Sequence, residues 1–213
     1  MKIIYQAQKE YPEKLNNIYS SPAKLYLVGD ELVLNKPSIA IIGCRDASDY
    51  GKRVAFNFAY ELAKEGFVIV SGLARGIDTY AHLGAVKANG KTIAVLGSGL
   101  RHIYPAENKE LCNEIVKKGG AVITEYEPHI KPLPMNFPSR NRIISGLSSG
   151  VLVVEAKQKS GTLITVDYAL EQGKDVFVIP GNITSTNSYG TNELIKQGAK
   201  PVTNIQEIIE EII

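Results

Sequence analysis

The sequence predicts an α/β fold with a doubly wound, mostly parallel sheet and helices on both faces. Apolar runs of strand length alternate with stretches of helical periodicity, which is typical of repeated βαβ units. Three runs end in a glycine that is soon followed by an arginine: Ser38–Gly43 before Arg45, Phe67–Gly72 before Arg75, and Thr92–Gly97 before Arg101. Because parallel strands end at one edge, we expect these arginines to lie where doubly wound proteins bind ligands.

Length and composition indicate how the chain is organised. Its 213 residues suffice for one large domain, and no linker, repeat or low-complexity tract divides them. We expect a main domain over 36–213 and a less regular lead-in over 1–35, with a helix near Tyr11–Leu15 and an edge element at Leu25–Val28. The net charge of +2 does not by itself predict a nucleic-acid partner. Two cysteines and the lack of a long apolar run favour a cytoplasmic protein without membrane contact.

The first half of the pattern is regular. The run Ile39–Gly43 precedes a helix from about Asp49 to Glu65, with Ser48 as the expected N-cap and Gly66 as the residue that ends it. The next expected elements are strand Val68–Ser71, a helix from about Gly76 to Lys87, strand Thr92–Leu96, a helix near Asn108–Lys118 and strand Ala121–Thr124.

The alternation breaks at Glu125–Pro138, where four prolines exclude a helix. A loop of this length inside a compact domain is usually functional or disordered. The elements expected after it are a helix from about Ser139 to Leu147, strand Val151–Glu155, helix Leu163–Gln172, strand Val176–Ile179, a polar loop from Gly181, helix Asn192–Gln197 and an acidic amphipathic helix Ile205–Ile213.

A cationic and aromatic segment, Phe137-Pro-Ser-Arg140-Asn-Arg142, joins the long loop to the next helix. The two arginines fall on different sides of that helix, so they cannot both belong to one solvated stripe. A helix N-terminus offers N–H groups to a phosphate, and an aromatic ring in a cationic groove suits single-stranded nucleic acid. The structural alternative is that Phe137 fills the core while Arg140 pairs with Glu125 or Glu155.

Other patterns have plainer interpretations. The glycine turns lack the dinucleotide fingerprint, and there is no Walker A sequence. Ser160-Gly-Thr162 can cradle a phosphate or simply cap the next helix. Asp78 and His82, one helical turn apart, are expected to share a structural hydrogen bond. Since no nucleophile, carboxylate pair or metal-ligand cluster stands out, the sequence favours a binding protein without cofactor or metal rather than an enzyme.

Several blocks in order carry a family resemblance: Gly43-Cys-Arg45, Ser71-Gly-Leu-Ala-Arg-Gly-Ile-Asp78, Thr92-Ile-Ala-Val-Leu-Gly-Ser-Gly-Leu100, Phe137-Pro-Ser-Arg-Asn-Arg-Ile-Ile-Ser145, Ser160-Gly-Thr-Leu-Ile-Thr165 and Gly190-Thr-Asn192. Together they resemble the DNA-processing protein A (DprA/Smf) family. The resemblance implies an extended Rossmann-like domain that binds single-stranded DNA, protects incoming strands in natural transformation and helps to load a RecA-type recombinase. The accessory N- and C-terminal domains of many members have no counterpart in these 213 residues.

The resemblance also implies a set of site residues. Arg45 would contact phosphate and Phe137 would stack on a base. The supporting residues would be Gly43, Ser71, Gly72, Arg75, Arg140, Asn141 and Arg142. Cys44 and Ala106-Glu107 depart from the family pattern and predict weaker DNA binding, for which Lys131 in the long loop can compensate.

The resemblance further implies a homodimer, for which Leu194 and Ile195 are the matching interface candidates. The alternative is that both side chains belong to the core of one subunit. A second function class is a nucleotide-binding enzyme related to the cytokinin-activating phosphoribohydrolases. Their Pro-Gly-Gly-x-Gly-Thr-x-x-Glu motif is here Pro180-Gly-Asn-Ile-Thr184, without the second and third glycines and the glutamate, so N-glycosidic hydrolysis is disfavoured.

Overall fold

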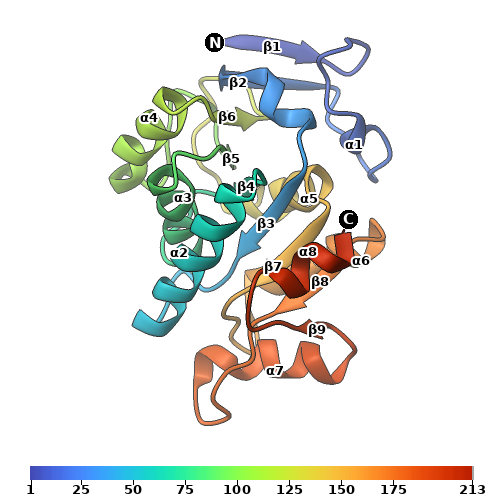
Figure 1. The fold of residues 1–213 in the computed structure, drawn as a ribbon. Helices are drawn as coiled ribbons and strands as arrows, with labels where there is room; N and C mark the ends of the chain where they lie inside the picture. The colour runs from blue at the N-terminus through green and yellow to red at the C-terminus, as the bar shows by residue number, and fades with distance from the viewer. Residues whose placement is uncertain (213) are drawn as a thin grey trace.

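A nine-stranded mixed sheet forms the centre of the computed structural model, which describes residues 1–212 (Figure 1). The strands lie in the order β1-β2-β6-β5-β4-β3-β7-β8-β9. Their bounds are β1 (Lys2–Tyr5), β2 (Lys24–Gly29), β3 (Ser38–Ile42), β4 (Val68–Ser71), β5 (Thr92–Val95), β6 (Ala121–Thr124), β7 (Gly150–Val153), β8 (Asp175–Val178) and β9 (Lys200–Pro201). Neighbours from β6 to β9 are parallel, whereas β2 runs antiparallel to both of its neighbours, β1 and β6. The predicted fold class is confirmed.

Helices cover both faces of this sheet (Figure 1). Their bounds are α1 (Glu13–Asn16), α2 (Asp49–Lys64), α3 (Ile77–Lys87), α4 (Lys109–Lys117), α5 (Asn136–Leu147), α6 (Gly161–Glu171), α7 (Tyr189–Lys196) and α8 (Gln206–Ile212), with 3₁₀ turns η1 (Glu31–Asn35), η2 (Ala106–Asn108) and η3 (Thr186–Ser188). Side chains alternate between the faces of a strand. In β3, Ala40 and Ile42 therefore pack toward α1, α5, α6 and α7, and Ile39 and Ile41 toward α2, α3 and α8.

Helix α2 begins and ends where the sequence predicts. The Ser48 hydroxyl accepts a hydrogen bond from the Gly51 N–H at 3.0 Å, as an N-cap does. Gly66 follows the helix with a φ of 91°, a left-handed conformation that costs glycine little. None of the helices in residues 1–212 is long and apolar enough to span a bilayer.

The lead-in differs from its prediction. Leu25–Val28 is not an edge element, because β2 lies between β6 and β1, and β1 forms the outer edge. Leu25 and Leu27 join the core cluster beside α5, so residues 1–35 extend the main sheet rather than only covering it. The short β1 offered too little apolar pattern to be predicted.

Three C-terminal details also differ. Helix α5 starts at Asn136, so Phe137 and Pro138 lie in its first turn, where a missing N–H removes no intrahelical bond. Helix α7 begins at Tyr189, before the predicted start, and the two-residue β9 was not predicted. The last predicted helix is present as α8, and its predicted final residue, 213, lies outside the described residues.

Candidate nucleic-acid interface

The chain reverses its order across the sheet between β3 and β7. From β3 it builds β4, β5 and β6 outward on one side, then returns to place β7 on the other side of β3. A hollow of about 380 Å³ opens at the carboxyl ends of these strands. Its walls come from the turn 43–46 after β3, the start of α3, the first turns of α5 and the loop 157–162 leading into α6. We call it the switch-point hollow, and it lies where open α/β sheets bind ligands.

Arg45 is an exposed cation of this hollow. Its guanidinium carbon lies 5.5 Å from the centre of the Phe137 ring, within the range of a cation–π contact. None of the ion pairs among residues 1–212 involves Arg45. Its charge is therefore available to a phosphate.

Phe137 is half-buried and does not fill the core. A Cβ at Gly97 would come within 2.9 Å of the ring, so the glycine after β5 makes room for Phe137. On another side the ring meets Tyr104, with centroids 5.5 Å apart and planes inclined at 53°. Phe137 thus lies at the surface of the hollow with an apolar backing.

Arg140 is buried beneath Phe137, with 4% of its surface exposed. Its Nη1 donates to the carbonyls of Gly72 and Val95, while the Asp78 carboxylate accepts from the N–H groups of Gly72 and Ala74 at 3.1 and 3.3 Å. Burial raises the pKa of Asp78, although the nearby Arg140 charge acts in the opposite direction. Burial also lowers the pKa of Arg140, to about 10. The predicted alternative, pairing of Arg140 with Glu125 or Glu155, is wrong.

Glycine is required at position 72 because these two charged groups approach it closely. A Cβ there would lie 2.7 Å from Arg140 Nη2 and 2.8 Å from Asp78 Oδ2. Ser71, next to it, is fully buried and donates to the Ile41 carbonyl at 2.7 Å. Gly43 is also packed closely, since a Cβ would meet the Ile77 side chain at 2.6 Å. These three residues therefore shape the strand ends that carry the hollow.

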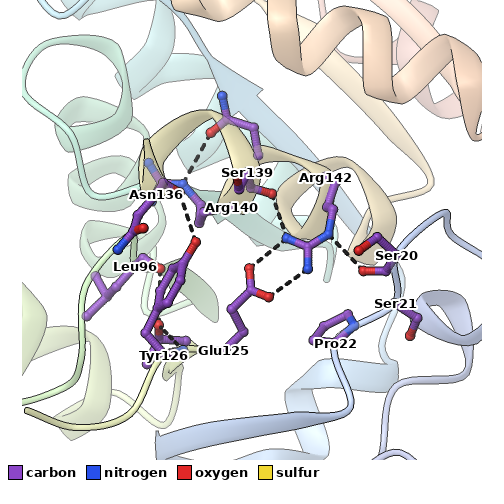
Figure 2. A network of polar contacts seen from close by, with 12 residues as sticks. Ser20, Ser21, Pro22, Leu96, Glu125, Tyr126, Asn136, Ser139, Arg140 and Arg142 are labelled. Atoms are coloured by element: carbon purple, nitrogen blue, oxygen red, sulfur yellow. Dashed lines mark hydrogen bonds and ion pairs between the residues drawn. The ribbon is translucent and has the colours of Figure 1, made fainter. Parts of the chain in front are cut away.

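Arg142 lies on the other side of α5, as the helical spacing predicts (Figure 2). Its guanidinium forms two 2.6 Å contacts with the Glu125 carboxylate and donates to the carbonyls of Ser20 and Ser139. Burial is the largest single influence and lowers its pKa, but hydrogen bonding and charge attraction to Glu125, together with nearby tyrosines, outweigh it, so the pKa of Arg142 is raised. Arg142 ties α5 to the lead-in and the long loop. It lines a different hollow, beside Tyr126 and Tyr168.

The remaining predicted cations are spread over the sheet edge. Arg75 lies beside Arg45, Tyr104 and Phe137 in a depression next to the switch-point hollow. Its Nε and Nη2 bind the Glu107 carboxylate at 2.6 and 2.8 Å, and both side chains are 55% exposed. Arg101 and Lys131 are exposed but line neither of these cavities. Asn141 lines the hollow, and its side-chain oxygen accepts from Arg140 Nε.

Sequence reasoning missed two lysines of the hollow. Lys157 pairs with Asp46 at 3.0 Å, and Lys159 is exposed. Both precede Ser160. The Ser160 hydroxyl accepts a hydrogen bond from the Thr162 N–H and so caps α6, which is the second of the two roles predicted for this segment. Two lysines just before a predicted helix start were the signal that could have identified them.

The predicted hydrogen bond between Asp78 and His82 is absent. His82 Nδ1 instead lies 2.7 Å from the Thr92 hydroxyl. Burial lowers the pKa of His82 to about 3, so the ring is neutral. Among residues 1–212, no group of three or more His, Cys, Asp or Glu side chains could hold a metal ion.

The sheet and its hollow define the class of the protein. It is a Rossmann-like α/β protein with a cationic and aromatic hollow at the switch point of the sheet. The family profile described as DNA recombination-mediator protein A matches residues 2–213, and the chain belongs to that family.

Relatives cover almost the whole chain. It is 45% identical over 207 residues to the DNA processing protein DprA of Bacillus subtilis, covering 97% of this chain and 69% of that protein. It is 46% identical over 202 residues to the protein Smf of Escherichia coli, covering 95% and 54%. The chain thus spans about half to two thirds of the length of these two relatives.

Solved structures agree with this assignment. DNA processing protein A of Streptococcus pneumoniae matches with a TM-score of 0.93 at 43% identity, covering 100% of this chain and 74% of that one. DNA processing protein A of Helicobacter pylori, described by its single-stranded DNA binding mode, matches with a TM-score of 0.88 at 35% identity, covering 99% and 95%. A molybdenum cofactor binding protein of Rippkaea orientalis shares the fold alone, with a TM-score of 0.59 at 23% identity over 83% of this chain and 95% of that one.

Proposed function

We propose that the protein binds single-stranded DNA in the switch-point hollow, with Arg45 at a phosphate and Phe137 against a base. The observation that carries the proposal is the Arg45 guanidinium, which has no ion-pair partner within residues 1–212 and lies over a half-buried aromatic ring. A cation beside an aromatic platform provides binding with little dependence on base sequence. The Helicobacter pylori relative, described as binding single-stranded DNA, supports the same ligand.

Binding to labelled single-stranded oligonucleotides over a salt series tests this proposal. For a contact with Z phosphates, the log–log slope is roughly −0.7Z. Arg45→Ala is expected to flatten it by about 0.7, and Phe137→Ala to weaken binding by about 1–3 kcal/mol. Lys87→Ala, at the far end of α3, removes one charge away from the hollow and serves as the control. Equal affinity for duplex and single strand, or no salt dependence, would contradict the proposal.

Glu107 is expected to restrain DNA binding because it neutralises Arg75 at the rim. Glu107→Gln should release the Arg75 guanidinium for another phosphate, raising the affinity and steepening the salt slope by about 0.7. The matched control is Glu110→Gln, an exposed carboxylate in the first turn of α4. An unchanged slope in Glu107→Gln would show that Arg75 does not contact the strand.

The proposal includes a homodimer formed around α7, as the family resemblance implies. Leu194 is only 8% exposed and packs in the core, so it belongs mainly to the subunit interior, whereas Ile195 is partly buried at the margin. Leu170, 61% exposed, lines a hollow with Leu194 and provides an apolar surface for a second copy. A C2 dimer would place this patch against itself.

Light scattering tests the dimer. Leu170→Glu and Ile195→Glu are expected to give folded monomers with weaker binding to long oligonucleotides and nearly unchanged binding to short ones, because paired sites act through effective concentration. Leu194→Arg serves as a control for core damage and should lower stability. A wild-type protein that is monomeric at micromolar concentration would contradict the dimer.

Delivery of the bound strand to a RecA-type recombinase in the cytoplasm, during natural transformation, is the wider role that we propose from the family resemblance. Its test is the rate at which a purified recombinase forms filaments on single strands coated with a single-strand-binding protein. Addition of this protein should raise that rate, and Arg45→Ala should reduce the stimulation. Stimulation that Arg45→Ala leaves intact would separate recombinase loading from the hollow.

A further inference from the structure

Tyr104 forms an aromatic pair with Phe137 at the rim of the switch-point hollow. Their ring centroids lie 5.5 Å apart, and their planes are inclined at 53°. Tyr104 is 41% exposed, whereas Phe137 is half-buried against Gly97. Tyr104 thus presents an accessible ring beside the ring already assigned to base stacking.

Each ring of this pair has a cation next to it. The Arg45 guanidinium lies over Phe137, and Arg75, which a phosphate would have to share with or take from Glu107, lines the same depression as Tyr104. A strand that crosses the depression would therefore meet a ring and an arginine twice in succession. This arrangement matches the repeating unit of a single strand, in which each base is joined to a phosphate.

The angle between the rings decides how two bases can lie on them. Stacked bases of one strand are parallel and roughly 3.4 Å apart along the axis. Rings inclined at 53° cannot both be parallel to two bases that remain stacked on each other. Two neighbouring bases can therefore use both rings only if they separate.

We propose that Tyr104 is a second base-contacting residue, and that the Tyr104–Phe137 pair holds two successive bases apart. The inference rests on the proposed binding of single-stranded DNA and adds a cause for strand selectivity. In a duplex, each base is held parallel to its neighbours by pairing with the opposite strand, so separation would require base pairs to break. In a flexible single strand, separating two stacked bases costs much less free energy. The cost is smallest at pyrimidine steps, because pyrimidines stack weakly. The inclined pair therefore favours single strands and gives a modest preference for pyrimidine runs.

Circular dichroism of an oligonucleotide with two adjacent 2-aminopurines tests the inference. The long-wavelength signal of this probe arises from stacking of the two analogues on each other, and the protein does not contribute to it. Saturating wild-type protein is expected to abolish most of the signal when the pair can occupy the site. Tyr104→Ala should retain the signal and bind roughly 5- to 150-fold more weakly, which is the loss of one stacked base. Tyr104→Phe should behave like the wild type, because it keeps the ring.

Tyr5→Ala is the matched control, since Tyr5 is 50% exposed and lies on β1 at the outer edge of the sheet. If the wild type binds the strand and the stacking signal persists, the inference is overturned and the proposed function stands. Tyr104→Ala that binds as tightly as Tyr5→Ala would also overturn it. If the wild type does not bind single strands at all, both the proposed function and the inference fail.

Discussion

Asp78→Ala is expected to lower the free energy of unfolding by about 3–5 kcal/mol, because it leaves the buried Arg140 charge without its compensating carboxylate. The two groups meet at Gly72, whose N–H donates to Asp78 and whose carbonyl accepts from Arg140. The substitution also removes the acceptor of the Ala74 N–H. Urea unfolding measures the loss as a lower midpoint with an unchanged slope.

Two further variants separate the causes of that loss. Asp78→Asn keeps an acceptor oxygen but removes the charge, so it should lose less stability than Asp78→Ala. Adding Arg140→Met to Asp78→Ala should recover part of the loss, because the unbalanced charge is removed as well. If the double variant loses as much unfolding free energy as Asp78→Ala and Arg140→Met lose separately when their losses are added, the two charges do not interact. A loss below about 1 kcal/mol for Asp78→Ala would refute the role of the pair.

Acidification is expected to destabilise the protein through His82, which the fold keeps neutral. Burial lowers its pKa from 6.5 to about 3, whereas the unfolded chain takes up a proton near pH 6.5. The stabilising effect of neutral His82 is therefore fully present above pH 6.5 and is lost as the pH falls toward about 3. The full effect is about 5 kcal/mol, of which about 2–3 kcal/mol should be lost by pH 4.5.

The hydrogen bonds of His82 identify the atom concerned. The Thr92 hydroxyl donates to the Ile69 carbonyl at 2.6 Å, so His82 Nδ1–H must donate to the Thr92 oxygen. Nε2 then takes up the added proton, and it has no hydrogen-bond partner among the described residues.

The difference in unfolding free energy between pH 7 and pH 4.5 tests this prediction. His82→Gln retains a side-chain N–H for Thr92 and cannot titrate. Its stability should therefore change less than that of the wild type over this range, after the shared effect of the carboxylates is subtracted. Parallel pH profiles of the two proteins would exclude His82 as the cause.

The sequence was sufficient for elements whose evidence is local. The apolar runs, the Ser48 cap and the Gly66 terminator are read from neighbouring residues, and they are present as predicted. β1 and β9 were missed because short strands obtain their stability from a partner strand, and no local pattern reports it. The start of α5 was predicted too late because Pro138 was taken to exclude a helix. Proline is unfavourable only in the helix interior and is tolerated in the first turn.

The site shows the same division. Three arginines were expected to gather at the strand ends; Arg45 and Arg75 lie around one depression, but Arg101 does not line it. The partner of each buried arginine was not predictable, because it depends on which loops lie against α5. Glu125 was predicted as a partner for Arg140 but binds Arg142. Arg140 instead donates to backbone carbonyls at the ends of β4 and β5, which are far from it in the sequence.

The order of the strands has a consequence for how the chain folds during synthesis. β2 pairs with β6, with Tyr26 opposite Thr124, so the antiparallel β1–β2 pair has no neighbouring strand until all of the intervening chain has been made. β3 waits still longer for β7. Contacts this far apart in sequence slow folding and lengthen the time during which apolar strands are exposed. Leu25 and Leu27 pack in the core cluster beside α5, so they are early targets for aggregation or for a chaperone until both β6 and α5 have left the ribosome.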